Sequence, residues 1–459
     1  MTMSNIVRMR GFLASSIGVT CAVALALPLT PPAAATVARP APSAEAAVPG
    51  STQSLPLTPL GADRSLGSAA VQGLPRRDVH RFSMVGVVWD DPDTALHGRV
   101  QVRARTLASG TWSPWQDVET HYGDDGADPG TPERAPGRVR GATAPLWVGD
   151  SDGVEVRVRA GAETREVGAA PSALPTGLRL ELVDPGEAAV PQGARVGGPR
   201  AGGGAGAEAP ETVAASAANA DLVALGATEI PALDRAQTER ELFALRAGEL
   251  TERQRAKPKI GPRPRIVTRR GWGANEKLRE KKFVYTKKVK AAFVHHTATG
   301  NGYRCSQAPS VIRGIYRYHV KSMGWRDIGY NFLVDKCGRI YEGRAGGVAK
   351  PVLGAHTLGF NTNSMGVAVL GTFGSARPTS AAVKAVARLT AWKLGLYGAD
   401  PSGKTYLKSG GGNLYRKGRN VRLNVISGHR DGFSTACPGR QLYRKLGSAR
   451  STAARYQGR

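Results

Sequence analysis

The stretch that decides the fold runs from Ser427 to Gly439 and reads SGHRDGFSTACPG. It places His429 and Cys437 eight residues apart in a chain that holds 4 cysteines in all. Imidazole and thiolate are ligand types that zinc favours, so the two ends of this loop can meet at one ion. Pro438 suits the first turn of a helix, which would put the thiol at a helix N-terminus, where the helix dipole favours the ionised sulfur. A surface histidine and a half-cystine are the alternative interpretation of this stretch alone.

A histidine far upstream supplies a third candidate ligand. Residues 291–298 read AAFVHHTA, and the apolar run at their start predicts a buried strand that delivers His295 at its end. With His429 and Cys437 this makes three protein ligands and one open position, the pattern of catalytic zinc, whereas four protein ligands are the structural pattern. His296 is the only candidate that we identify for a fourth ligand. Adjacent strand residues point to opposite faces, so we expect it to lie outside the site.

Seven segments of the C-terminal part resemble, in unbroken order, the peptidoglycan recognition protein family and the related phage zinc amidases, which are N-acetylmuramoyl-L-alanine amidases. The resemblance is specific because so many short motifs fall in the same order, and it covers less than half of the chain. The matching segments are GWGA (271–274), HHTA (295–298), DIGYNF (327–332), YEGR (341–344), GAH (354–356), GFN (359–361) and the loop 429–437.

The resemblance implies a fold and an activity. The expected fold is an α/β catalytic domain, with a mixed β-sheet covered by helices, and the expected activity is zinc-dependent cleavage of the amide bond between N-acetylmuramic acid and L-alanine in peptidoglycan. His295, His429 and Cys437 would hold the Zn²⁺ ion. One alternative is a recognition module that binds peptidoglycan without cutting it; in this family that goes with loss of the cysteine ligand, and Cys437 is present. The other is a polyanion-binding domain with a purely structural zinc, which requires a fourth protein ligand.

Two helper residues follow from the resemblance. Amide hydrolysis at neutral pH needs a strong nucleophile and stabilisation of charge on the carbonyl oxygen, and zinc can supply both. Because a thiolate ligand feeds negative charge to the ion, we expect a less acidic water and a greater need for helper groups. The resemblance implies Tyr330 as a hydrogen-bond donor to the oxyanion and Thr435 as a group that orients the water. Phage amidases of this kind have lysine in place of Thr435, so the general base stays open.

The resemblance also implies a groove for the sugar and stem peptide. Arg344 would hold a stem carboxylate with two hydrogen bonds. The alternative for each groove residue is a loop-stabilising contact, and for His319 it is also a hydrogen-bonded core histidine. The implied groove residues are His319, Arg344, His356, Thr357 and Asn361.

The cysteine count fits a metal site in a secreted protein. Removal of a signal peptide leaves three cysteines, and an odd number leaves one unpaired in an oxidising compartment. If Cys437 binds metal, Cys305 and Cys337 remain to form a disulfide bond. Family members often carry a disulfide in this part of the domain, although its partners vary.

The N-terminus predicts secretion. Arg8 and Arg10 precede the apolar stretch 11–29, and residues 33–35 fit a cleavage site, so residues 1–35 are interpreted as a signal peptide. A retained membrane anchor is the alternative, although no other stretch is apolar enough to span a bilayer. We therefore expect a secreted protein, extracellular or associated with the cell wall, without a stable membrane anchor and monomeric.

Charge is distributed unevenly along the chain. The formal net charge is +27, and residues 263–459 alone hold 37 Lys and Arg against 7 Asp and Glu. Such asymmetry suggests that the C-terminal domain meets an anionic polymer. In a secreted protein, wall polymers with phosphate groups are better candidates than nucleic acid. We expect peptidoglycan and anionic wall polymers as partners, and no nucleic acid.

Residues 77–186 predict a small all-β, sandwich-like accessory domain. The segments 99–105, 154–159 and 178–182 alternate between apolar and polar residues, with Gly, Pro and Asp between them. The tryptophans in this region can stack on sugar rings, and core packing is the alternative. The domain resembles N-terminal regions attached to secreted actinobacterial amidases, which implies a wall-targeting or accessory role.

Composition sets the remaining boundaries. Residues 36–76 are rich in Ala, Pro and Ser without periodicity and are predicted to be unstructured. Residues 187–262 are interpreted as a linker rich in Gly, Ala and Pro, with a helical patch near 235–250. In the catalytic domain, residues 263–459, apolar spacing predicts helices at 309–323 and 380–396, a hairpin across 329–342, and strands at 365–370 and 421–426.

Overall fold

The structure, a computed structural model, describes residues 49–60, 71–120, 125–161, 173–187 and 208–459. The predicted signal peptide lies outside these residues. Every described residue belongs to one compact unit. Among the described residues, no helix is both long enough and apolar enough to cross a membrane.

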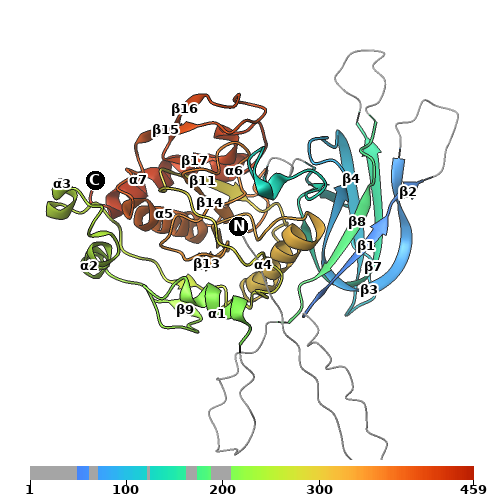
Figure 1. Ribbon diagram of the computed structural model, residues 1–459. Coiled ribbons are helices and arrows are strands. Elements are labelled where there is room, and N and C mark those ends of the chain that lie inside the picture. The colour runs from blue at the N-terminus through green and yellow to red at the C-terminus, as the bar shows by residue number, and fades with distance from the viewer. Residues whose placement is uncertain (1–48, 61–70, 121–124, 162–172, 188–207) are drawn as a thin grey trace, which may run out of the picture. The chain divides into compact units, whose positions relative to one another are not determined.

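The N-terminal part is an all-β domain, as predicted, built on one eight-stranded sheet (Figure 1). The strand order is β1-β8-β3-β7-β4-β5, and β2 and β6 also pair with β3. Apolar side chains of β3, β4, β7 and β8 form one buried cluster, so the sheet encloses its own core. The strands are β1 (Ser51–Pro56), β2 (Thr58–Pro59), β3 (Val71–Trp89), β4 (Gly98–Thr106), β5 (Gln116–Val118), β6 (Gly141–Ala142), β7 (Leu146–Ala160) and β8 (Arg179–Asp184).

Alternation along β4 separates the two faces of this sheet. Val100 and Val102 are fully buried in the domain core. Arg103, between them and the next buried residue, points to the other face, where its guanidinium lies 4.8 Å from the centre of the Trp115 ring. Arg157 of β7 lies 4.1 Å from the same ring. Trp115 therefore packs against arginines on the outer face of the sheet, which favours a packing role.

Secondary structure is more extensive than predicted in two segments, one expected to be unstructured and one expected to be a linker with a single helical patch near 235–250, where α2 (Arg235–Arg246) lies. β1 lies within residues 36–76 and pairs with β8 over its whole length. Residues 187–262 include three helices and a strand, and Ile230 and Leu242 from this region are buried in the core of the C-terminal domain. Only a few apolar residues anchor these segments. Because the surrounding sequence is rich in Ala, Gly and Pro, the composition of the segments does not predict their helices and strands. The elements are α1 (Pro210–Ala217), β9 (Glu229–Ile230), α2 (Arg235–Arg246) and α3 (Glu252–Ala256).

The C-terminal domain is an α/β domain on a seven-stranded mixed sheet, which confirms the predicted fold class. The strand order is β17-β11-β14-β12-β13-β10-β9. β17, β11, β14 and β12 run parallel, and β12 and β13 form the predicted antiparallel hairpin. The remaining strands are β10 (Ile266–Val267), β11 (Ala291–His296), β12 (Phe332–Val334), β13 (Ile340–Glu342), β14 (Ser364–Val369) and β17 (Ile426–Gly428).

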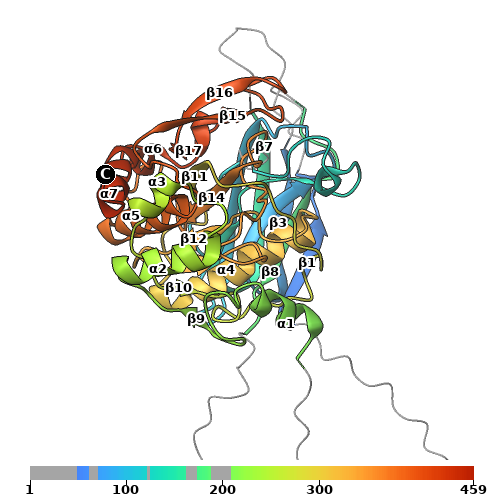
Figure 2. The ribbon, with the colours of Figure 1, turned by 60° about the vertical axis from the view of Figure 1, so that its left-hand side comes forward.

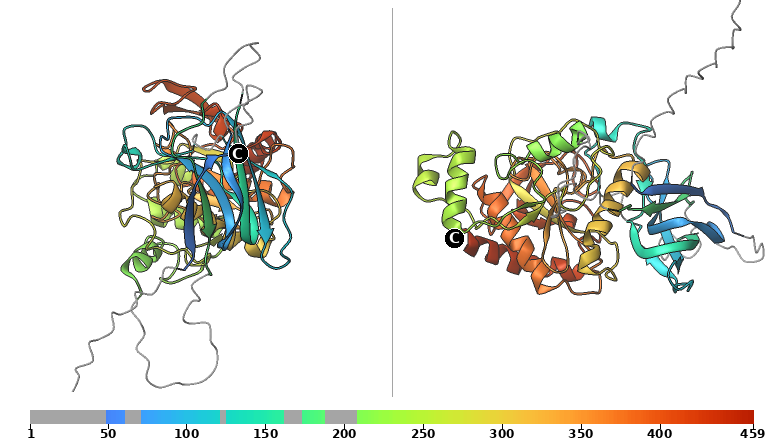
Figure 3. Two further views of the ribbon diagram at one scale, coloured as in Figure 1. Left: turned by 90° about the vertical axis from the view of Figure 1, so that its right-hand side faces the viewer. Right: turned by 90° about the horizontal axis from the view of Figure 1, so that it is seen from below.

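Helices cover both faces of this sheet. α5 (Ser380–Gly395) and α7 (Leu446–Tyr456) pack side by side on one face (Figures 1 and 2). α4 (Ala308–Arg317) continues into the π-helical turn η3 (Tyr318–Ser322) on the other face, where it lies between the two sheets (Figure 3). Both helices lie where the sequence predicts them. Cys305 and Cys337 form the expected disulfide bond, which ties the start of α4 to the turn between β12 and β13.

One predicted strand is two strands. The segment 421–426 spans the end of β16 (Asn420–Asn424), which pairs with β15 (Lys404–Lys408) in a separate two-stranded sheet, and the start of β17. Val425 lies between them: its backbone N–H donates to Gly403 O, next to β15, and its carbonyl accepts from Ala292 N of β11. A continuous apolar alternation therefore conceals a change of hydrogen-bonding partner.

The two domains share a buried core around α4 and η3. Met84 and Val183 of the N-terminal sheet belong to the same apolar cluster as Ile315 of α4. Tyr318 of η3 donates a hydrogen bond across the contact to Thr143 O at 3.1 Å. The N-terminal domain is thus packed against the C-terminal domain by an apolar interface that this hydrogen bond crosses.

Candidate metal centre

Two parallel strands deliver two histidines to the same edge of the C-terminal sheet. β11 and β17 pair in register, with Val294 opposite Gly428. His295 and His429 are the next residues of the two segments and therefore emerge side by side. Their ring centroids lie 4.5 Å apart, and both side chains are buried.

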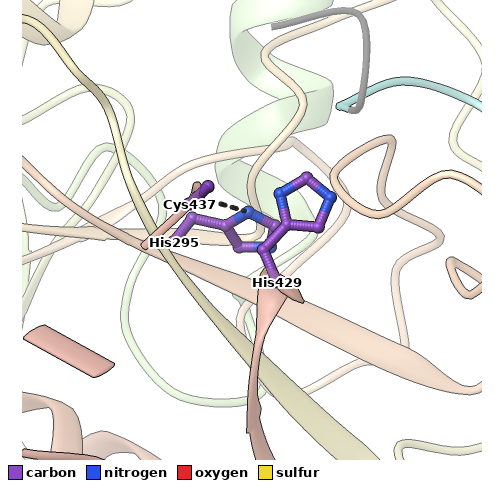
Figure 4. A group of neighbouring side chains, drawn as sticks. All are labelled: His295, His429 and Cys437. Carbon is purple, nitrogen blue, oxygen red and sulfur yellow. Dashed lines mark hydrogen bonds between the residues drawn. The ribbon is translucent and has the colours of Figure 1, made fainter. Parts of the chain in front are cut away.

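Cys437 reaches the same place from the loop that follows η4 (His429–Asp431). Arg430 N donates to Cys437 O at 3.1 Å, so the loop folds back and brings Cys437 Sγ to 3.8 Å from His295 Nδ1. Figure 4 shows the cysteine side chain facing the His295 ring, with the His429 ring beside it. The prediction that Pro438 lies in the first turn of a helix is wrong. α6 (Arg440–Tyr443) begins only after Gly439, whose φ of 82° is not helical.

A carboxylate from the N-terminal domain completes this cluster. The donor atoms of His295, His429 and Cys437 lie within 4.8 Å of one another. Asp125 Oδ1 lies 3.2 Å from His295 Nδ1 and 3.4 Å from His429 Nδ1. Zn–N and Zn–O bonds of about 2.0–2.1 Å at tetrahedral angles separate two donors by about 3.3 Å, and a Zn–S bond of about 2.3 Å gives about 3.6 Å between N and S. The measured separations of 3.2, 3.4 and 3.8 Å are close to these edges, so the residues present fit a zinc ion.

Asp125 is a buried carboxylate in an environment that disfavours its charge. Tyr330 donates its hydroxyl to Asp125 Oδ2 at 2.7 Å, whereas Oδ1 accepts no hydrogen bond from the described residues. Burial raises the pKa of Asp125 to about 6, although His429 and Tyr330 oppose the shift. Burial, with a smaller contribution from His296, lowers the pKa of His295 to about 3, which keeps this ring in the neutral form that binds metals. A cation among these groups would offset the cost of burying the carboxylate.

Thr357 and His356, which were predicted to line the groove, lie behind His295. Thr357 Oγ1 is 3.3 Å from His295 Nε2 and 3.0 Å from His356 Nδ1. This contact fixes the His295 ring with Nδ1 towards the cluster. Polar partners of this kind set the orientation of metal-binding histidines and tune the metal.

Arg344 and Asn361 contact a segment of the N-terminal domain, residues 125–134, which we call the acidic segment. Glu133 accepts two hydrogen bonds from Arg344, Nη1 to Oε2 at 2.9 Å and Nη2 to Oε1 at 2.7 Å. Asn361 Nδ2 donates to Asp128 Oδ1 at 2.7 Å and to the Gly126 carbonyl at 2.8 Å. The acidic segment therefore contacts both the candidate metal site and two of the predicted groove residues.

His319 and Thr435 have contacts of another kind. His319 lies fully buried in η3, where Nδ1 accepts from Gly329 N at 3.1 Å and the ring lies 4.4 Å from that of Trp325. Burial, with Arg344, lowers the pKa of His319 to about 3. These contacts favour the alternative of a core histidine. Thr435 Oγ1 accepts from Cys437 N at 3.2 Å and so shapes the loop that presents the thiol.

Sequence reasoning missed the carboxylates of the acidic segment. Asp125, Asp128 and Glu133 lie in a loop rich in Gly and Pro, without periodicity, in a domain interpreted as separate. The search for a fourth ligand therefore stayed within the C-terminal domain. The signal that points to them is charge, because three carboxylates fall within this short loop while the C-terminal domain is strongly basic.

Fold and site together describe an α/β domain with a candidate metal site, fused to a β-rich domain. Residues 285–440 match the family described as N-acetylmuramoyl-L-alanine amidase. Residues 38–176 match the family described as Rv3811 N-terminal galactose-binding domain-like. The chain belongs to the family of peptidoglycan-recognition proteins and N-acetylmuramoyl-L-alanine amidases.

Individual relatives match the C-terminal part. Peptidoglycan-recognition protein SC2 of Drosophila simulans is 30% identical over 184 residues, which is 39% of this chain and 84% of the relative. The N-acetylmuramoyl-L-alanine amidase of Homo sapiens is 40% identical over 99 residues, 20% of this chain and 16% of the relative. A solved structure of peptidoglycan recognition protein-LE, in complex with tracheal cytotoxin, is 31% identical with a TM-score of 0.31, covering 40% of this chain and 92% of that one.

Proposed function

We propose that the protein is a secreted, zinc-dependent N-acetylmuramoyl-L-alanine amidase, which hydrolyses the bond between N-acetylmuramic acid and L-alanine in peptidoglycan. The observation that carries the proposal is the convergence of His295, His429 and Cys437 in a buried cluster with separations suited to zinc. Family membership supports it, since the chain keeps a thiol at the third ligand position.

The residues of the chain have separate tasks in this proposal. His295, His429 and Cys437 would hold the zinc ion, which supplies an acidified water and a Lewis acid for the amide carbonyl. The Thr357 hydroxyl orients the His295 ring, because Thr357 Oγ1 lies 3.3 Å from His295 Nε2. Tyr330 already donates to a carboxylate oxygen at 2.7 Å beside the cluster, so the same hydroxyl can donate to an oxyanion that forms there.

The partner and the location belong to the same proposal. The solved structure of peptidoglycan recognition protein-LE holds a monomeric diaminopimelic acid-type peptidoglycan, which makes a muropeptide the first ligand to test here. The surplus of Lys and Arg in residues 263–459 supports additional binding to anionic wall polymers. Secretion rests on the charged start, apolar stretch and small-residue site of residues 1–35.

Digestion of purified cell walls tests the activity. The mature protein, supplied with zinc, is incubated with walls, and the new ends are identified by mass spectrometry. New L-alanine amino termini with intact glycan strands are the expected products, and chelation should abolish them. New reducing sugars would indicate a glycosidase. Binding of muropeptides without any new end would instead favour a recognition module.

A further inference from the structure

The acidic segment covers the proposed catalytic groove with its own carboxylates. It places Asp125 in the metal cluster, Asp128 on Asn361 and Glu133 on Arg344. We propose that the acidic segment is an internal occupant of the groove, with Asp125 as a fourth protein ligand of the zinc ion and Glu133 on the Arg344 guanidinium, and that a muropeptide must displace it. This inference rests on the proposed function.

The geometry at Asp125 is that of a ligand. Its Oδ1 atom lies at tetrahedral-edge distances from two imidazole nitrogens, 3.2 and 3.4 Å, and the carboxylate is 4% exposed. Its other oxygen is held by the Tyr330 hydroxyl, which fixes the orientation of the carboxylate. Four protein ligands close a zinc site, whereas a catalytic site keeps one position for water. In this conformation Asp125 therefore takes the position that the water needs.

Glu133 takes the place of a ligand carboxylate on Arg344. Both side chains are at least nine-tenths buried, and the pair is bidentate. The other guanidinium hydrogen bonds of Arg344 go to backbone carbonyls, among them Ile328 O from Nε at 2.9 Å. A carboxylate of a stem peptide can thus reach this guanidinium in the same planar fashion only after Glu133 leaves.

Asp128 occupies hydrogen-bond donors of the groove next to this arginine. Its Oδ1 atom accepts from Asn361 Nδ2 at 2.7 Å and from Gly359 N at 2.8 Å. Burial raises the pKa of Asp128, and these hydrogen bonds oppose the shift. The same side chain and backbone donors become available to a sugar or peptide only when the acidic segment moves.

The rest of the N-terminal domain holds the acidic segment in place. Arg140 N, just beyond it, donates to Met323 O at 3.1 Å, and Arg138 forms an ion pair with Glu280. Because the domains also share a core, the segment acts at a high effective concentration. A muropeptide in solution competes with the acidic segment. The apparent affinity of the muropeptide is therefore its intrinsic affinity multiplied by the fraction of molecules in which the groove is open.

Ligand binding to zinc-free full-length protein tests the groove contacts without catalysis. A disaccharide muropeptide is titrated calorimetrically into the parent, the variant Asp128→Asn/Glu133→Gln and the control Asp117→Asn. Asp117 pairs with Arg99 on the surface of the same domain. The double variant should bind at least tenfold more tightly than the parent, and the control should match the parent. Equal affinities of all three proteins would overturn the occupancy of the groove.

Zinc affinity tests the ligand assignment. Competition with a chromogenic chelator should give Asp125→Asn a zinc dissociation constant at least tenfold above that of the parent, with Asp117→Asn unchanged. An unchanged constant for Asp125→Asn would remove Asp125 from the ligand set. If a variant fails to fold, hydrogen exchange of the parent replaces it: the amides of residues 125–140 should exchange faster when muropeptide is added, and slower or equal exchange would contradict displacement.

The failure of this inference differs from the failure of the proposed function. A parent that never cleaves muropeptide, together with tighter binding by the double variant, removes the amidase and keeps the internal occupant. Equal cleavage rates and equal affinities for the parent and the double variant keep the amidase and remove the internal occupant.

Discussion

Cys437 is the donor that distinguishes a zinc site here from a pair of packed histidines. Its sulfur lies 3.8 Å from His295 Nδ1 and is buried. Cys437→Ala should therefore lose bound zinc, measured by elemental analysis, and with it all hydrolysis. Muropeptide binding by the zinc-free protein should persist. Ser434→Ala, an exposed neighbour in the same loop, serves as the control and should keep both zinc and activity. Zinc and full activity in Cys437→Ala would remove the metal assignment.

The Tyr330 hydroxyl belongs to the same cluster but does not belong to the ligand set. Tyr330→Phe keeps the buried ring and removes the group that donates to Asp125 Oδ2. If this hydroxyl stabilises the oxyanion, turnover at saturating muropeptide should fall on the order of 10²-fold, about 2.7 kcal/mol, with zinc content unchanged. Saturation matters because the same change loosens the acidic segment. Turnover at the parent rate would pass the role to the metal.

The convergence of His295, His429 and Cys437 could be predicted from the sequence, because each ligand type occurs in a short motif at the end of a predicted strand or loop. Asp125 was not found, because nothing in its neighbours separates it from an ordinary loop carboxylate. Its position beside His295 and His429 depends on the packing of one domain against another, which no local pattern encodes.

At the scale of elements, the Cys305–Cys337 bond joins the N-terminus of α4 to the β12–β13 turn. The two cysteines are 32 residues apart in the sequence. Cross-linking a loop of that length stabilises the folded chain by about 3–4 kcal/mol, chiefly through the entropy of the unfolded state. The variant Cys305→Ala/Cys337→Ala should lose about that much in urea unfolding. Its zinc content should stay unchanged, because Cys437 is outside the bond, and an unfolding curve equal to that of the parent would contradict the estimate.

Helix α5 contains a buried lysine whose charge depends on folding. Lys393 is fully enclosed and donates to Val348 O and Lys350 O at 2.5 and 2.7 Å, and burial holds its pKa well below the ordinary value of 10.5. Between the lowered pKa of Lys393 in the folded chain and 10.5, the unfolded chain thus binds more protons than the folded chain, so this group makes stability rise with pH in that range. Lys393→Met should lose that slope in urea unfolding between about pH 7 and 10. Lys384→Met, exposed on the same helix, should keep it, and parallel profiles for all three proteins would contradict the shift.

Elements were predictable where one apolar period covers the whole segment. α4 with η3, α5 and the β12–β13 hairpin match their predictions because each buries a continuous face. The segment 421–426 was predicted as one strand, since alternation continues across Val425 while the partner strand changes from β15 to β11. α2 lies in the helical patch expected near 235–250, whereas α1 and β9 were missed because only a few residues, such as Ile230, anchor them to the core.

At the scale of the molecule, charge separates the two domains and also joins them. Residues 263–459 carry a large surplus of Lys and Arg, whereas the preceding part is near neutral. Glu133 neutralises one of these charges inside the groove through its ion pair with Arg344. Other cations of this domain, among them Lys384 and Arg388, are exposed and can act on other partners. A sequence pattern predicts this imbalance, but it does not predict which charges face each other.

The basic outer surface of the C-terminal domain is the candidate binding site for anionic wall polymers. A cavity of 820 Å³ away from the metal cluster is lined by Arg339, Lys384 and Arg388, among others. If anionic wall polymers bind the basic surface, affinity for intact walls should fall at least tenfold between about 0.05 and about 0.5 M salt, as the Debye length shortens from about 14 to about 4 Å. Walls stripped of anionic polymers should bind weakly at every salt concentration. Lys384→Gln/Arg388→Gln should weaken binding more than Lys404→Gln/Lys408→Gln on β15, and cleavage of a small soluble muropeptide should be equal in both. Binding that does not change with salt would mean that the cations keep the domain soluble and do not hold the wall.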